Sequence, residues 1–220
     1  MKVLVACEES QVVCNAFRAK GHEAYSCDIV PTRGEHPEWH IQDDVRNLLF
    51  ATGNFIQHQY QDGAPAPGDQ GFWDILIIHV DCRYLANSGV RWLYNPDGTT
   101  NSKRWWQLVN ASSFFMLFYD GITCKIPRVC IENPIPHKHA ELPDYTQIIQ
   151  PWWFGNFGEN ETKATCLWLK NLPKLVKVNP LPEPHNHSVH RMAPGPNRSR
   201  DRAVTFKGIA EAMADQWSNL

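Results

Sequence analysis

The sequence predicts an α/β fold, built on a doubly wound and mostly parallel sheet, from three observations. Apolar runs of strand length recur along the chain, as expected for parallel strands that are covered on both faces. Segments with helical spacing of apolar residues alternate with these runs. Polar residues stand directly after several runs, where open α/β sheets hold their ligands. We therefore expect a Rossmann-like domain that spans residues 1–220.

The first part of the chain predicts the opening strand–helix–strand unit of this fold. Lys2–Cys7 is an apolar run typical of a buried parallel strand. Ser10–Lys20 has apolar residues at helical spacing, and a glycine follows it as a stop signal. Ala24–Ile29 predicts the second strand, with Asp28 near its end. Such a unit opens a doubly wound sheet.

The later elements follow from the same patterns. A third short strand or turn and a helix start are expected within His40–Leu49. Further strands are expected at Trp73–Val80, Arg128–Ile131, Gln147–Gln150 and Lys163–Leu169. Further helices are expected at Trp105–Gly121 and Thr205–Trp217. Loops rich in turn residues are expected at Ala51–Gly71 and Asn95–Ser102, together with a Pro-rich basic segment at residues 173–204.

Composition narrows the class of protein. An apolar content of 43% excludes disorder as the main state. No stretch approaches the about 20 apolar residues of a membrane span, and the first apolar run is too short for a secretory signal. We therefore expect a cytoplasmic protein without a membrane partner. The net charge is −2, from 21 basic and 23 acidic residues, which by itself argues against a simple nucleic-acid binder.

The net charge conceals an asymmetry along the chain. Residues 163–207 hold nine Lys and Arg against two acids, whereas residues 1–60 hold eight acids against five bases. The basic segment could contact DNA phosphates or form a solvated loop. Trp152–Phe154 could stack on a base or belong to the core. The candidate nucleic-acid-binding residues are Lys163, Arg191, Arg198, Arg200 and Arg202.

The cysteines and histidines indicate neither a disulfide framework nor a metal site. Seven cysteines are an odd number, and none has C-x-x-C spacing, so we expect reduced thiols. Several lie in apolar stretches typical of core: Cys7, Cys27, Cys130 and Cys166. The one histidine cluster, in the basic segment, has no supporting cysteine or carboxylate pair, so no metal is expected.

Candidate functional groups stand at four strand ends: Glu8 and Glu9, Asp28, Cys82, and Glu132. Each has a plain structural alternative. Cys82 could be a buried small hydrophobe rather than a nucleophile. Glu132 and Asp28 could each cap a turn.

Long ordered segments of the chain resemble one family. These are VLVACEESQVVCNAFRAKGHEAYSCDI, HPEWHIQDDV, WDILIIHVDCRYLANSGVRWL, IENP, QIIQPWWFGN, ETKATCLWLKNLP and TFKGIAEAMADQW. They are similar to the short phage and prophage proteins classed as cytosine-specific DNA methyltransferases acting on carbon 5. The resemblance implies the class I S-adenosylmethionine-dependent methyltransferase fold, S-adenosylmethionine as cofactor and double-stranded DNA as partner. For a phage-encoded protein it implies the bacterial host cytoplasm, and no obligatory protein partner is evident.

The resemblance also implies roles for single residues. Asp28, with Ile29 beside it, resembles the acid that binds the ribose hydroxyls of the donor, and Asp44 with Val45 resembles the part that reads its adenine. The donor loop corresponds to Cys7, Glu8, Glu9 and Ser10, where backbone amides at a helix start suit the donor's carboxylate.

The implied catalytic residues are Cys82, Glu132, Asn133 and, more distinctively, Arg83. Cys82 resembles the nucleophile that attacks carbon 6 of a flipped cytosine, which makes carbon 5 able to accept a methyl group. Glu132 resembles the acid that holds ring nitrogen 3 and the exocyclic amine, in a turn fixed by Asn133.

The sequence departs from the family at the nucleophile. Val80–Asp81–Cys82 stands where Pro-Pro-Cys is usual, and Arg83 replaces a small hydroxyl residue. Asp81 disfavours the thiolate, whereas Arg83 favours it. Several readings stay open: an active methyltransferase; transfer of a carboxymethyl group from a carboxylated donor held by Arg83; a non-catalytic cofactor- or nucleotide-binding protein; and a transferase for free nucleotides or RNA. Because only two loops are available for target recognition, we expect short or relaxed sequence specificity.

Overall fold

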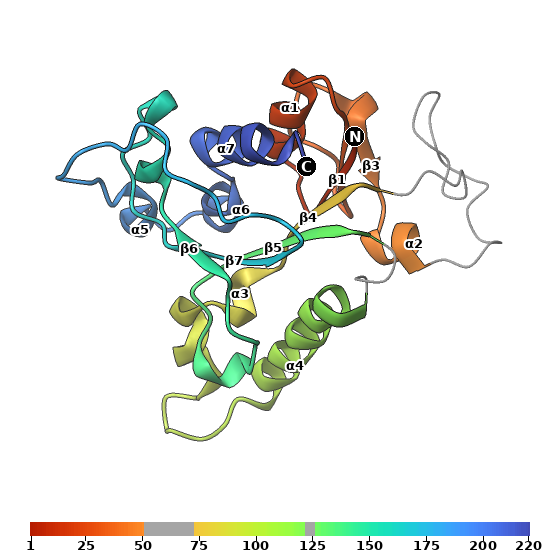
Figure 1. Ribbon diagram of the computed structural model, residues 1–220. Helices are drawn as coiled ribbons and strands as arrows, with labels where there is room; N and C mark the ends of the chain where they lie inside the picture. The colour runs from red at the N-terminus through yellow and green to blue at the C-terminus, as the bar shows by residue number, and fades with distance from the viewer. Residues whose placement is uncertain (51–72, 122–125) are drawn as a thin grey trace.

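The computed structural model describes residues 1–50, 73–121 and 126–220 (Figure 1). Its centre is a seven-stranded sheet in the order β3-β2-β1-β4-β5-β7-β6. The strands are β1 Lys2–Ala6, β2 Glu23–Asp28, β3 His40–Gln42, β4 Ile75–His79, β5 Arg128–Pro134, β6 Gln147–Ile149 and β7 Thr165–Lys170. Strands β1 to β5 are parallel, and β7 is antiparallel to both β5 and β6. The predicted α/β class and mostly parallel sheet are therefore confirmed, in a form compatible with a Rossmann-like fold.

Helices cover both faces of the sheet (Figure 1). They are α1 Val12–Ala19, α2 Val45–Phe50, α3 Cys82–Leu85, α4 Ser102–Met116, α5 Ser188–Arg191, α6 Arg198–Ala203 and α7 Lys207–Trp217. Helices α1 and α7 pack side by side on one face, and α2, α3 and α4 cover the other. Among the described residues, no helix is both long and apolar enough to cross a membrane.

Alternating side chains of the central strands divide the core into two layers. Ile75 and Ile77 of β4 pack with Phe17 of α1 and Trp217 of α7. Ile78, one residue further along β4, belongs to the opposite layer with the α4 side chains. This alternation follows from the two-residue period of a strand, and burial on both faces explains the unbroken apolar runs. Each large side chain buried in this way contributes about 1.5–3 kcal/mol.

The predicted elements agree with the observed ones except at particular boundaries. Strand β5 continues through Pro134 rather than ending at Ile131, because its last residues pair with antiparallel β7. The long helix ends at Met116 and continues as a wider π turn over Leu117–Gly121. The predicted loop Ala51–Gly71 lies outside the described residues.

The basic segment has more structure than a loop. It contains the two short helices α5 and α6. Beside it, Phe154 is buried in the core and Trp153 packs against the same layer. Trp152 stacks on His185 at a ring separation of 4.4 Å. Of the two readings of Trp152–Phe154, core packing therefore holds for Trp153 and Phe154.

Candidate functional site

A cavity of about 780 Å³ lies at the carboxyl ends of β1, β2, β4 and β5. This is where a doubly wound sheet changes winding direction between β1 and β4, and where such sheets bind ligands. The size falls within the range of small-molecule sites. Most of the predicted site residues line this one cavity: Cys7, Glu8, Glu9, Ser10, Asp28, Ile29, Asp44, Val45, Cys82, Arg83 and Glu132.

The β1–α1 loop is organised by Glu8, which is only 4% exposed. Its Oε1 accepts from the backbone N–H of Val13 at 2.7 Å, and its Oε2 accepts from that of Cys14 at 3.2 Å. A carboxylate from the chain itself thus caps the first turn of α1. Burial is the main cause that raises the pKa of Glu8 above its usual value. This differs from the sequence expectation, in which helix-start amides served a donor's carboxylate, because Glu8 already accepts two of them.

Asp28 and its neighbour Ile29 form the far side of the cavity from Cys82. Burial raises the pKa of Asp28, whose Oδ1 accepts from the Val30 N–H at 3.2 Å. Ile29 is 70% exposed although it is apolar, and it lines the cavity. A partly buried carboxylate beside an uncovered apolar side chain suits a ligand with hydroxyl groups next to a flat apolar part.

Asp44 and Val45, at the start of α2, line the side of the cavity that Asp28 and Ile29 form. Val45 is buried at the cavity wall. Both oxygens of Asp44 accept from Arg46, at 2.5–3.0 Å, and this pairing lowers the pKa of Asp44. Asp44 is therefore held in place as an anion, already paired with a cation.

The turn that carries Cys82 has Asp81 where the family that the chain resembles has proline. Asp81 caps α3, with its Oδ1 accepting from the Arg83 N–H at 3.1 Å. The Asp81 carboxylate also binds the Arg83 guanidinium through both oxygens, at 2.5–2.9 Å. Arg104 braces the turn by donating to the Arg83 carbonyl at 2.5 Å. The two unusual residues thus neutralise each other.

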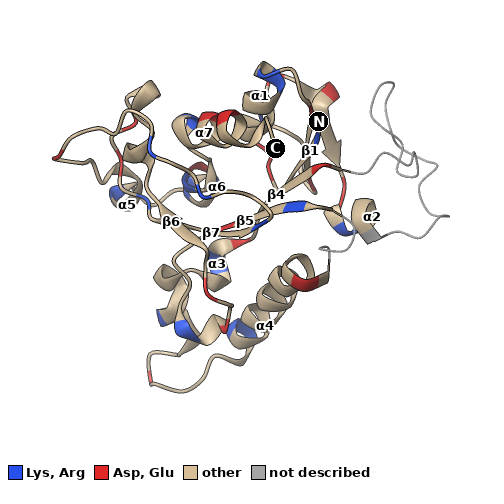
Figure 2. Ribbon diagram, viewed as in Figure 1, with Lys and Arg blue, Asp and Glu red and all other residues tan. Residues whose placement is uncertain are grey.

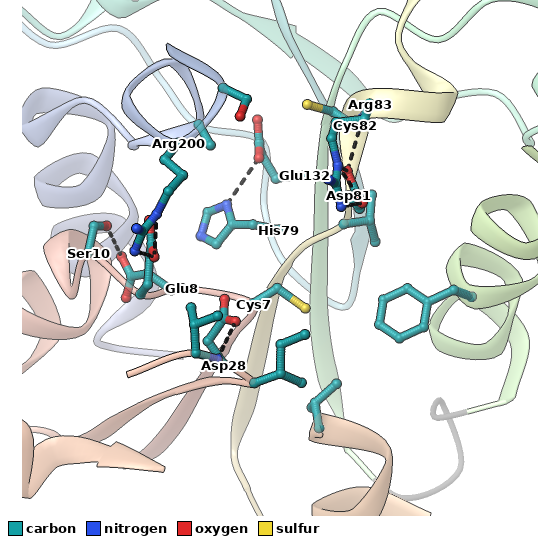
Figure 3. Close-up of a pocket in the computed structure, with 18 of the residues that line it drawn as sticks. Cys7, Glu8, Ser10, Asp28, His79, Asp81, Cys82, Arg83, Glu132 and Arg200 are labelled. Atoms are coloured by element: carbon teal, nitrogen blue, oxygen red, sulfur yellow. Dashed lines mark hydrogen bonds and ion pairs between the residues drawn. The ribbon is translucent and has the colours of Figure 1, made fainter. Parts of the chain in front are cut away.

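Cys82 begins α3 and faces the cavity, with Glu132 across from it (Figure 3). Burial raises the pKa of its thiol, with further contributions from Glu132 and Asp81. Lys163 and Arg202 oppose this rise through their positive charge. The net direction is upward, so in the free protein Cys82 is a thiol rather than a thiolate at neutral pH.

Glu132 is bound by a residue that sequence reasoning missed. His79, the last residue of β4, is the direct cross-strand neighbour of Glu132 on parallel β5. Its Nδ1 lies 3.0 Å from Oε2 of Glu132, and both side chains are nearly buried. The pair raises the pKa of His79 and lowers that of Glu132, because each charge stabilises the other more than burial penalises it.

Asn133, in contrast, does not reach the cavity. Successive strand residues point to opposite faces, so Asn133 turns away from the face that carries Glu132. It is fully buried, and its Nδ2 donates to the Pro134 carbonyl at 2.6 Å. Asn133 can therefore hold the end of β5, as expected for a turn-fixing residue, without meeting a ligand in the cavity.

The C-terminal part of the basic segment, α6 and the residue after it, lines the cavity. Arg200 of α6 binds both oxygens of Glu9. Arg33 binds Glu9 at 2.9 Å and Asp201 at 3.0 Å. In Figure 2, red acidic positions lie next to the blue basic positions of α6, in agreement with the ion pair between Arg200 and Glu9. Part of the predicted phosphate-binding charge is thus already paired with acids of the first 60 residues.

The five predicted nucleic-acid-binding residues fall into two groups. Lys163, Arg200 and Arg202 line the cavity, and the first and last of these act on the pKa of Cys82. Arg191 and Arg198 lie outside it, and Arg198 donates to the Met192 carbonyl at 2.8 Å. These positions favour a role inside the cavity, near Cys82, for Lys163 and Arg202 over a role on an open surface.

Sequence reasoning also missed the α4 side of the cavity. Its lining includes Gln107, Asn110 and Phe114 of α4, and Tyr84 of α3 also lines the cavity. The sequence signal that could have indicated this lining was the mixture of polar and aromatic residues on one face of the predicted helix Trp105–Gly121. In the part of the chain that the structure describes, no group of three or more His, Cys, Asp or Glu side chains is placed to hold a metal ion.

The site is thus a cavity with a thiol and a paired carboxyl on one side and a carboxylate with apolar neighbours on the other. No family model and no curated protein matches the chain.

Proposed function

We propose that the protein is an S-adenosylmethionine-dependent transferase that modifies carbon 5 of cytosine in double-stranded DNA. The observation that carries this proposal is the shared cavity of Cys82, Glu132 and Asp28. A sulfur nucleophile and a carboxyl group that face each other suit covalent activation of a pyrimidine. The second carboxylate lies where a doubly wound fold holds a nucleoside-containing ligand. The resemblance of the chain to cytosine-5 methyltransferases points to the same reaction.

The residues present fit the proposed donor. Asp28 offers a carboxylate for ribose hydroxyls, and Ile29, Val45 and Phe114 offer apolar surface for an adenine ring. Ser10, Cys7 and Glu9 complete the loop beside them. When bound, S-adenosylmethionine supplies an electrophilic methyl group.

The chain's own residues perform the remaining chemistry. The base leaves the duplex, since neither Cys82 nor Glu132 could reach it in the stack. Cys82 gives up its proton to water and its sulfur bonds to carbon 6, while Glu132 stabilises the charge that develops at nitrogen 3. Lys163 and Arg202 favour the thiolate that this step needs. After transfer, the carbon 5 proton leaves to water and Cys82 is expelled as thiolate.

The structure does not favour a donor carboxylate on Arg83. Its guanidinium already binds the Asp81 carboxylate through two oxygens. A carboxymethyl donor would have to displace that bidentate pair, which is among the stronger charged hydrogen-bond arrangements. We therefore propose methyl transfer in preference to carboxymethyl transfer.

One specific observation favours a second candidate, a protein that binds donor without transferring. The raised pKa of the Cys82 thiol lowers the amount of nucleophile available in the free state. DNA binding would then have to shift this pKa for the enzyme to act.

The test is a covalent trap. The protein is incubated with isotope-labelled S-adenosylmethionine and duplexes that carry 5-fluorocytosine, because fluorine at carbon 5 cannot leave as a proton and the adduct accumulates. The proposal expects a protein–DNA adduct that Cys82→Ser abolishes. Donor binding without any adduct would contradict it and support the binding protein. Mass analysis of nucleosides from ordinary duplexes would separate methyl from carboxymethyl products.

A further inference from the structure

The ring of His79 lies between two carboxylates in the wall of the cavity, those of Glu132 and Glu8 (Figure 3). His79 and Glu132 are cross-strand partners at the ends of two adjacent parallel strands. Their side chains project to the same face of the sheet, so the sheet itself sets the 3.0 Å contact between Nδ1 and Oε2. Such a pairing is rigid, because moving either group would require a shift of a core strand.

The second nitrogen of this ring is unusual. His79 Nε2 is buried and has no hydrogen-bond partner among the residues that the structure describes. A histidine that serves only to fill a polar place in a core normally has both nitrogens bonded. The ring of His79 is instead held from one side, by Glu132 alone.

The charged groups around His79 favour a stored proton. Glu132 faces it from β5, and Glu8 faces it from the β1–α1 loop. Lys163, before β7, acts in the opposite sense. Both oxygens of Glu8 are engaged by α1 amides, so Glu8 contributes its field to the ring and not a competing hydrogen bond. Two carboxylates against one ammonium group favour the protonated form of the ring and outweigh the opposite effect of burial.

We propose that His79 is the positioning residue of Glu132, and that it stores the proton which Glu132 delivers to nitrogen 3 of the target cytosine. This inference rests on the proposed function. His79 does not touch the base itself. It holds the carboxyl at the cavity wall through the 3.0 Å contact between Nδ1 and Oε2.

The proposed step moves one proton from His79 through Glu132 to nitrogen 3 and later returns it. As the Cys82 sulfur bonds to carbon 6, the π electrons of the 5,6 double bond move into the ring towards nitrogen 3. Glu132, a carboxylate in the resting pair, first takes the proton from Nδ1 of His79 and then gives it to nitrogen 3. The imidazolium becomes neutral and Glu132 ends as a carboxylate. When the thiolate is expelled, the proton returns from nitrogen 3 to the pair.

The first test needs neither DNA nor donor. Ring ¹⁵N signals of the histidines are titrated by NMR in the wild type, and the His79→Asn variant identifies the His79 signal. The expected result is a His79 pKa above its usual 6.5 that falls in Glu132→Gln. Titration at or below 6.5, or a value that Glu132→Gln leaves unchanged, would overturn the inference.

The second test measures adduct formation on 5-fluorocytosine duplexes against pH. Asparagine at position 79 places a neutral N–H near the former Nδ1, so it keeps the hydrogen bond but stores no proton. The variant should be on the order of 10²-fold slower near neutral pH. In the variant the proton must come from Glu132 itself, whose protonated fraction falls about tenfold per pH unit, whereas the wild type keeps its proton on His79. The ratio of wild-type to variant rates should therefore rise about tenfold per pH unit up to the pKa of His79. Using this ratio cancels the ionisation of Cys82, which both proteins share.

A matched control exists in the same chain. His36 also places Nδ1 at 3.0 Å from a carboxylate, that of Glu38, but both are exposed and lie outside the cavity. His36→Asn should leave the rate and its pH dependence unchanged. If the ratio of the wild-type rate to the His79→Asn rate stays constant across pH, His79 has only a structural role. That result would overturn the proposal that His79 stores a proton. If the wild type forms no adduct, the proposed function fails, while the NMR titration still decides the proton pair.

Discussion

Glu8 and Glu9 are neighbours in the chain, yet they belong to two different electrostatic regions of one cavity. Glu8 lies on the inner wall, which we define as Glu8, His79 and Glu132. Glu9 lies on the outer rim, defined as Glu9, Arg33, Arg200 and Asp201. Sheet strands and a helix start fix the inner wall, whereas exposed long side chains make up most of the rim. The two regions should therefore respond differently to mutation, salt and pH.

The inner wall should carry the larger effect on folding. Glu8→Ala leaves the buried N–H groups of Val13 and Cys14 without their acceptor, and we expect a loss of about 2 kcal/mol in the free energy of unfolding. Glu9→Ala, one residue away, should cost under about 1 kcal/mol because its partners are solvated. Urea unfolding of the three proteins measures both.

The pH dependence sharpens this comparison. Because the pKa of Glu8 is raised, the folded state binds its proton more readily than the unfolded state. The contribution of Glu8 to stability therefore declines as pH rises from its usual 4.5 through the raised value. The stability gap between wild type and Glu8→Ala should be wider at low pH than at neutral pH. Equal losses for both alanine variants would remove the distinction between wall and rim.

The outer rim should instead control DNA affinity. Glu9 occupies two guanidinium groups, those of Arg33 and Arg200. Glu9→Gln should release them to phosphates, raising affinity for duplex DNA about three- to tenfold at low salt and steepening the salt dependence by about one ion. Fluorescence anisotropy at several salt concentrations measures this. Glu38→Gln is the matched control, since Glu38 is exposed and outside the cavity. Weaker binding by Glu9→Gln would show that the paired rim, not the released one, binds DNA.

The contrast between the regions also explains what the sequence could predict. Asp28, Cys82 and Glu132 were recognisable because parallel strands bring their carboxyl ends to one edge of a sheet. His79 was not, because its contact with Glu132 depends on the register between β4 and β5. A strand residue's partner across the sheet is set by tertiary packing, and the sequence around His79 carries no sign of it.

Charge counting failed at the rim for a related reason. It placed a surplus of basic residues in the C-terminal part of the chain, but it could not reveal that Arg200 binds Glu9 across 191 positions. Counting gives the number of charges, whereas their availability depends on which ones the fold pairs. The basic helix α6 therefore lines the cavity as well as being a candidate DNA contact.

The smallest expected effect concerns the turn before α3, where Asp81 stands at the position that is proline in the family that the chain resembles. Asp81→Asn keeps the cap on α3, because asparagine caps as well as aspartate. It removes one of the negative charges that raise the pKa of the Cys82 thiol, and it frees Arg83. Alkylation of Cys82 by iodoacetamide at about pH 8, followed by mass analysis of the Cys82 peptide, should therefore be about two- to threefold faster. Asp97→Asn, at an exposed turn, should leave the rate unchanged. An unchanged rate in Asp81→Asn would mean that Asp81 contributes little to the raised pKa of the Cys82 thiol. In that case aspartate in place of proline would not alter the reactivity of Cys82, and the departure of this turn from the methyltransferase pattern would not argue against the proposed reaction.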